Sequence, residues 1–280
     1  MQIALISSTK DPASVNIKEI NIKETLLNDF KFVKLENKFN NNDVYGYLIG
    51  NKDVKLYTIN SELIFADDLD KKIDADVLIF LSKHKAADGR ASLTCHPIGN
   101  FGASEKGGKE KTLCTCPSSL LKEILIELSK NVENTEYEAT LESTHHGPSM
   151  GKPLLFFELG STEKHWNDKN GAKIYVKTLM NVLHQENKSY ESVFVIGGPH
   201  YNHVANKAML NTGYAVGHIC PKHNLENLDE EMLRQAMEKI IPKPKFALLD
   251  WKGLSKEKQR ILKMLEKNSI KYERSDRFFG

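Results

Sequence analysis

Short apolar runs alternate along the chain with segments in which apolar residues recur every three to four positions. Runs of the first kind predict buried β-strands, and the helical spacing predicts amphipathic helices. In residues 117–130, for example, Leu120, Ile124 and Leu128 recur at helical spacing, whereas residues 44–60 predict a hairpin around a Gly-Asn-Lys-Asp turn. Further strands are predicted at 2–8, 76–84, 136–143, 153–160, 192–198, 214–219 and 245–251, and further helices at 162–186, 202–211, 228–240 and 255–268.

The alternation of predicted strands and helices favours an α/β fold. We expect a three-layer α/β/α sandwich built on a mixed, largely parallel sheet. A chain of 280 residues is long enough to bury one large core, so we interpret residues 1–280 as a single α/β domain. The helices after about residue 226 are a candidate C-terminal subdomain, and the helix predicted at 162–186 has a candidate break near Asn170 and Gly171.

The composition excludes some classes of protein. With 39 basic and 37 acidic side chains the net charge is +2, which excludes a strongly basic nucleic-acid-binding coat but not a local basic patch. No apolar run approaches the roughly 18 residues that a membrane span requires. The four cysteines lack the spacing of a disulfide framework, and no signal peptide is recognisable. We therefore expect a soluble cytoplasmic protein that does not bind membranes, and a monomer.

Histidines follow several of the predicted strands. They are His84, the pair His145 and His146, His200 and His218, and His96 lies in the segment after the strand that ends at His84. In an open α/β sheet, ligands bind outside the carboxyl ends of parallel strands, so these histidines would meet if their strands were parallel neighbours. Imidazole is a common zinc ligand, and a catalytic zinc site needs three protein ligands and one open position. The alternative for any single histidine is a hydrogen-bonded structural role.

The segment Glu142-Ser-Thr-His-His-Gly-Pro148 brings an acid and two adjacent histidines to one point of the chain. In a strand continued to residue 146, His146 would share a face with Glu142, and His145 would point to the other face. Both histidines can serve one site only if the chain bends, which Gly147 and Pro148 permit. Glu142 and Glu158 are candidate oxygen ligands, or hydrogen-bond partners of ligating histidines.

A glycine-rich segment at 99–111 matches neither the Walker A pattern nor the dinucleotide-binding fingerprint. Its three lysines, Lys106, Lys109 and Lys111, are candidate contacts to the phosphates of a nucleic acid, as is the segment with Lys243 and Lys245. The alternative interpretation of residues 99–111 is a mobile surface loop.

Six motifs, taken together and in order, resemble the archaeal and plant type of D-aminoacyl-tRNA deacylase. They are FLSKH (80–84), TCHPIGNFG (94–102), STHHGP (143–148), ELGSTEKHW (158–166), IGGPHY (196–201) and GHICPKH (217–223). The resemblance implies a zinc-dependent esterase that removes D-amino acids from mischarged tRNA, with an architecture related to phosphorylases and peptidyl-tRNA hydrolase. The expected partner is the acceptor end of D-aminoacyl-tRNA, and a water molecule activated by Zn²⁺ would attack the ester.

Candidate roles follow from these motifs and from the chemistry of the reaction. The expected metal ligands are His84, His96, His146, His200 and His218; the catalytic candidates are Glu142, His145 and His146; the substrate-binding candidates are Asn100, Gly160, Ser161, Thr162, Gly197 and Gly198; and the candidate tRNA phosphate contacts are Lys106, Lys109 and Lys111. Two other functions remain open from the sequence. One is a metal-dependent amidohydrolase or peptidase, and the other is a metal-free nucleotide- or RNA-binding protein whose histidines stack on bases.

Overall fold

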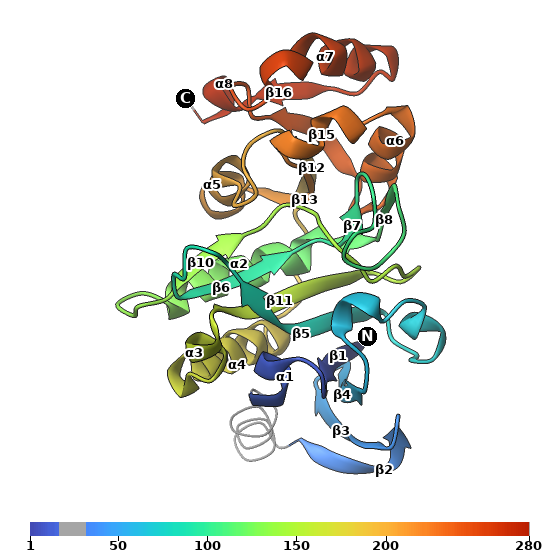
Figure 1. Ribbon diagram of the computed structural model, residues 1–280, viewed down its shortest axis with the longest axis vertical. Coiled ribbons are helices and arrows are strands. Elements are labelled where there is room, and N and C mark those ends of the chain that lie inside the picture. Colours follow the sequence, from blue (N-terminus) through green and yellow to red (C-terminus); the bar gives the residue numbers. More distant parts are fainter. Residues whose placement is uncertain (17–31, 280) are drawn as a thin grey trace.

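The computed structural model describes residues 1–16 and 32–279, which form two larger β-sheets, two short strand pairs and the helices that cover them (Figure 1). Within these residues, the large sheet has eight strands in the order β10-β6-β11-β5-β1-β4-β3-β2. Their bounds are β1 (Gln2–Ser8), β2 (Val33–Phe39), β3 (Asn42–Ile49), β4 (Lys52–Ile59), β5 (Val77–Lys85), β6 (Ser92–His96), β10 (Glu138–Leu141) and β11 (Leu154–Ser161).

The four central strands of the large sheet, β4, β1, β5 and β11, are parallel. Strand β6 pairs with β11 in the antiparallel direction and β10 pairs parallel to β6, so both run opposite to β5. Strand β11 is buried along its whole length, as expected for a strand that is covered on both faces. The predicted α/β fold with a mixed, largely parallel sheet is confirmed, and β3 and β4 form the predicted hairpin.

The second sheet has the order β13-β12-β15-β16, and each adjacent pair is parallel. Its strands are β12 (Glu191–Ile196), β13 (Tyr214–Cys220), β15 (Pro244–Leu249) and β16 (Tyr272–Arg274). The segment after residue 226 thus contains strands as well as helices, and β15 pairs with β12. Two further short pairs join β7 (Gly99–Asn100) to β8 (Thr112–Leu113) and β9 (Cys116–Pro117) to β14 (Ile240–Ile241).

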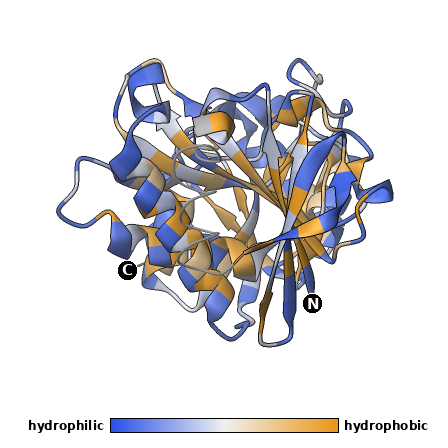
Figure 2. Cartoon of the chain, turned by 90° about the horizontal axis from the view of Figure 1, so that it is seen from below, coloured by the Kyte–Doolittle hydropathy of each residue, from blue (hydrophilic) through white to orange (hydrophobic). Residues whose placement is uncertain are grey.

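Helices α2 and α4 pack against each other, and their apolar side chains share one core with the large sheet. The opposite face of that sheet is covered by 3₁₀ turns and loops, including η3 (Leu63–Phe65) and η4 (Leu69–Lys71). The helices are α1 (Pro12–Asn16), α2 (Ser118–Asn131), α3 (Glu163–Trp166), α4 (Lys169–His184), α5 (His203–Asn211), α6 (Glu230–Glu238), α7 (Lys258–Lys267) and α8 (Ser275–Phe278), with further 3₁₀ turns η5 (Lys222–Asn227) and η6 (Ser255–Glu257). Figure 2 shows apolar residues concentrated on the strands and the inward helix faces.

The helix predicted at 162–186 is divided into α3 and α4, slightly before the predicted break. The division falls at Asp168, whose side chain accepts hydrogen bonds from the backbone N–H groups of Asn170 and Gly171 and caps α4. Within residues 1–16 and 32–279, no helix has the length and apolar character needed to cross a membrane.

Candidate active site

The segment 142–146 lies between the two sheets and is hydrogen-bonded to both. Glu142 N–H donates to Cys95 in β6, whereas the N–H groups of Ser143 and Thr144 donate to the carbonyls of His200 and Ile219, which belong to the second sheet and the turn after it. The histidine pair is therefore placed where side chains from both sheets converge.

The predicted bend after the histidine pair is confirmed. His146 has φ of 44°, a left-handed conformation that is uncommon for residues other than glycine, and the Gly147–Pro148 peptide is cis. As a result the rings of His145 and His146 lie on the same side, with their centroids 4.4 Å apart. Gly147 is required here, because a Cβ at this position would lie 2.2 Å from the backbone nitrogen of Gly108.

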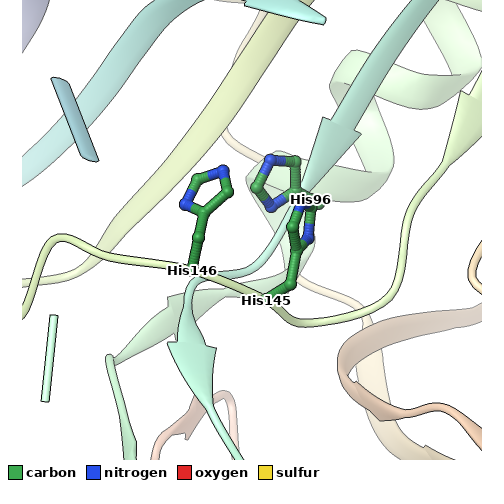
Figure 3. A group of neighbouring side chains, drawn as sticks. All are labelled: His96, His145 and His146. Carbon is green, nitrogen blue, oxygen red and sulfur yellow. The ribbon is translucent and has the colours of Figure 1, made fainter. Parts of the chain in front are cut away.

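Three histidines, His96, His145 and His146, form a compact group (Figure 3). The His96 centroid lies 4.2 Å from that of His145 and 4.8 Å from that of His146. Each ring places its Nδ1 against a backbone carbonyl, at 3.2 Å from Pro97, 2.8 Å from Ser143 and 2.5 Å from Gly147. Because a carbonyl oxygen only accepts, each Nδ1 carries the proton, and each Nε2 of a neutral ring keeps a lone pair.

Two buried carboxylates and His84 form the adjacent part of the site. His84 Nδ1 lies 3.2 Å from Glu142 Oε1 and 3.3 Å from Glu158 Oε2, and only the contact with Glu158 has hydrogen-bond geometry. The other His84 nitrogen, Nε2, lies 2.9 Å from the Tyr201 hydroxyl. The second oxygen of Glu142 accepts a 2.8 Å hydrogen bond from His200 Nε2.

The pKa shifts divide the site into a charged part and a neutral part. Burial opposes the protonation of His84, but its close contacts with the carboxylates of Glu142 and Glu158 outweigh it and raise the His84 pKa to about 10. Burial likewise opposes the ionisation of Glu158, yet its contacts with His84 and His96 lower its pKa to about 2. Burial lowers the pKa of His146 to about 4 and takes that of His145 well below its usual value, so both rings are neutral at pH 7.

Glu142 contributes to stability because it compensates buried positive charge. Replacing Glu142 with alanine is expected to lower the free energy of unfolding by about 3 kcal/mol, which is the lower end of the cost of breaking a buried ion pair. The lower end applies because Glu158 still faces His84 in the variant. Urea unfolding measures the effect. The control is Glu138→Ala, since Glu138 lies on β10, the strand that leads into Glu142, but is exposed and pairs with Arg90 at the surface. Equal losses for the two variants would contradict this role.

The site opens onto a cavity of about 290 Å³. Its lining includes the site residues His84, Glu142, His145, His146, Glu158 and His200, together with Lys10, Asp11, Glu62, Leu63, Ile64, Ser82, Lys83, Lys85 and Lys106. The cavity therefore combines buried acid and imidazole groups at its base with several lysines.

The histidines converge for a different reason from the one expected. Their strands are not parallel neighbours, because β5 and β10 run in opposite directions with β11 and β6 between them, and β12 and β13 belong to the second sheet. His218 is not brought into any of the three groups of potential ligands found among the described residues. Its Nε2 donates to the Cys114 carbonyl at 2.8 Å and its Nδ1 accepts from the Thr144 hydroxyl at 3.1 Å, so both nitrogens are occupied.

The substrate-binding candidates do not line this cavity. Asn100 Nδ2 donates to the carbonyls of Gly107 and Lys109 and thereby holds the glycine-rich segment in place. The end of β11 supports His84, because a Cβ on Gly160 would lie 2.3 Å from the His84 carbonyl oxygen. The other candidates have local contacts: Ser161 with the Arg90 carbonyl, Thr162 with His165, and Gly197 and Gly198 beside Asp250.

The lysines of the glycine-rich segment differ from one another. Lys106 lines the cavity, whereas Lys109 and Lys111 do not, and Lys111 forms a 2.7 Å ion pair with Asp229. The segment packs against the histidine bend, because Gly147 N–H donates to the Lys106 carbonyl. Its contacts are thus those of an ordered loop.

Some site residues were missed from the sequence. Tyr201 belongs to the IGGPHY motif but was not considered, although it directly follows His200. Lys10, Lys83 and Lys85 lie at the carboxyl ends of β1 and β5, which are adjacent parallel strands. The sequence signal for these lysines is their position at or just after the ends of two predicted strands, because the carboxyl ends of adjacent parallel strands share one edge of the sheet.

Comparisons with known proteins place the chain in a family. The family model described as D-aminoacyl-tRNA deacylase matches residues 71–273. A D-aminoacyl-tRNA deacylase of Methanosarcina barkeri is 35% identical over 95% of this chain and 87% of its own length, and one of Pyrococcus furiosus is 32% identical over 93% and 95%. The crystal structure of a conserved protein of unknown function covers 99% of this chain and 96% of its own, with 28% identity and a TM-score of 0.85. The chain belongs to the D-aminoacyl-tRNA deacylase family.

Proposed function

We propose that this protein hydrolyses the ester bond of D-aminoacyl-tRNA and releases the free D-amino acid and tRNA. The observation that carries the proposal is the group of His96, His145 and His146 beside two buried carboxylates, in a chain of this family; His145, His146, Glu142 and Glu158 line one cavity. An aminoacyl ester is already reactive, so the site needs to activate water and stabilise the developing negative charge.

We further propose that His96, His145 and His146 hold a zinc ion. Two buried acceptor atoms, His96 Nε2 and Glu142 Oε1, have no hydrogen-bond partner among residues 1–16 and 32–279. His96 belongs to the three-histidine group, and Glu142 belongs to the overlapping group with His145 and His200. A cation satisfies lone pairs without needing a donor. Burial lowers the pKa of His96, but the nearby Glu158 carboxylate outweighs this effect and raises it, so the site favours positive charge at the His96 ring. A cation bound to His96 would replace the proton that this ring otherwise gains. When bound, zinc supplies Lewis acidity that activates water for attack on an ester at neutral pH.

The remaining residues of the site handle charge and protons. His84, kept protonated between Glu142 and Glu158, provides positive charge beside the reacting carbonyl. The His200 side chain is 35% exposed, more than the 27% of His145, and its Nε2–H is oriented by Glu142. It is therefore the group that exchanges protons with the leaving ribose oxygen.

The test of this function compares D- and L-tyrosyl-tRNA as substrates. We expect kcat/KM for the D-ester to exceed that for the L-ester by at least about a hundredfold, or about 2.7 kcal/mol, because the side chain of one enantiomer is sterically excluded. Release of radiolabelled tyrosine measures both rates. Equal hydrolysis of the two esters would reject D-selectivity, and cleavage of peptides without cleavage of either ester would support an amidohydrolase instead.

A further inference from the structure

Four lysines surround the cavity whose floor carries the proposed catalytic groups. Lys10 follows β1, Lys83 and Lys85 lie at the end of β5, and Lys106 belongs to the glycine-rich segment. We call these four residues the lysine rim. They come from three separate parts of the chain, yet they line the same cavity as His145 and Glu142.

Most of the lysine rim is not neutralised by the protein. Lys10, Lys85 and Lys106 are exposed, and none of them has an ion pair with a residue in the described part of the chain. Lys83 lies 3.8 Å from Asp11, whose carboxylate also accepts hydrogen bonds from the backbone of Ser14 and Lys83.

The carboxylates that line the cavity are mostly buried, unlike the lysines of the rim. Glu142 and Glu158 are buried at the floor and face histidines, which leaves Glu62 as the exposed carboxylate of the lining. Positive charge therefore exceeds negative charge at the mouth, although the whole chain carries a net charge of only +2. Lysine ammonium groups that line a cleft without ion-pair partners attract anions.

We propose that the lysine rim binds the phosphates of the last nucleotides at the 3′ end of tRNA. This inference rests on the proposed function, because the ester is attached to the ribose of the terminal nucleotide. With the ester carbonyl at the floor, the ribose-phosphate chain has to leave through the mouth, where the lysines lie. The amino acid itself carries no phosphate, so the rim recognises the RNA part of the substrate.

Of the three lysines in the glycine-rich segment, one belongs to the lysine rim. Lys106 belongs to the rim, whereas Lys111 is already paired with Asp229 and Lys109 lies outside the cavity lining. The phosphate contacts are thus shared between Lys106 and the ends of β1 and β5.

The test measures deacylation of two substrates with the same ester, D-tyrosyl-tRNA and the D-tyrosyl ester of adenosine, which has no phosphate. For Lys10→Gln and for Lys85→Gln, the kcat/KM on tRNA relative to that on the adenosine ester is expected to fall about fivefold per lysine. The slope of log KM for tRNA against log salt concentration should also decrease by about 0.7 per lysine. Lys173→Gln, an exposed lysine on α4 outside the cavity, is the control.

Thermal melting checks that each variant is folded, which is expected because the substituted side chains are exposed. An unchanged ratio of the two substrates, or an equal effect of Lys173→Gln, would overturn the lysine rim while leaving the proposed function intact. A wild-type protein that hydrolyses neither ester would overturn the proposed function and the rim with it.

Discussion

Removing zinc with a chelator is expected to reduce hydrolysis of D-tyrosyl-tRNA by at least about a thousandfold, or about 4 kcal/mol of transition-state stabilisation. The reason is that His96, His145 and His146 each offer a ring nitrogen within 4.8 Å of the others, and each Nδ1 is occupied by a backbone carbonyl, which leaves Nε2 as the atom suited to a cation. The measurement is single-turnover deacylation before and after dialysis against chelator, with recovery on addition of Zn²⁺.

Two further readouts separate a resident zinc ion from a metal needed only by the tRNA. Elemental analysis of protein purified without a histidine tag should find at least one zinc per chain. Zinc at a hundred times its dissociation constant should stabilise the chelated protein by about 2.7 kcal/mol, because it binds only the folded site. A fully active protein that contains no metal would contradict the zinc proposal, and the three histidines would then need another role.

The substitution His145→Ala is expected to lower kcat/KM on D-tyrosyl-tRNA about a thousandfold. His145 is central, since its ring centroid lies 4.2 Å from that of His96, 4.4 Å from that of His146 and 4.7 Å from that of His200. It belongs both to the three-histidine group and to a second group with Glu142 and His200. Its loss thus removes one proposed ligand and exposes the neighbouring acid.

The control for this variant is His203→Ala. The His203 side chain is 72% exposed and lies near Asp250, outside the cavity lining. Both variants are expected to unfold cooperatively at similar urea concentrations, whereas zinc content should fall only in His145→Ala. A His145→Ala enzyme that keeps more than a tenth of the wild-type kcat/KM would show that this residue is not required.

Most strands and helices could be predicted from the sequence because the burial of each is decided locally. The run at 153–160 is apolar except for Glu158 and becomes β11, which is buried along its whole length, and the spacing in 117–130 becomes α2. Which strands become neighbours depends on chain reversals that local hydrophobicity does not encode. The local pattern therefore does not show that the strands carrying His84 and His218 lie in different sheets. Strand β6 gives no signal for another reason, because only two of its five side chains are apolar.

The site could be predicted in part for the same reason. The bend at Gly147 follows from local turn chemistry, and it brings His145 and His146 together. Whether a histidine nitrogen is free, however, depends on atoms contributed by distant segments. The Cys114 carbonyl occupies His218, while the nearby carbonyl of Pro97 leaves His96 Nε2 open, and no spacing rule distinguishes the two.

The position of segment 142–146 between the two sheets has a consequence for how the enzyme can fail. Because consecutive backbone amides of this segment are anchored on opposite halves of the molecule, neither half contains a complete reaction centre. A substitution that only weakens the packing of one half on the other would therefore abolish turnover before either half unfolds. The temperature of heat inactivation would then depend on the contact between the halves rather than on their hydrophobic cores.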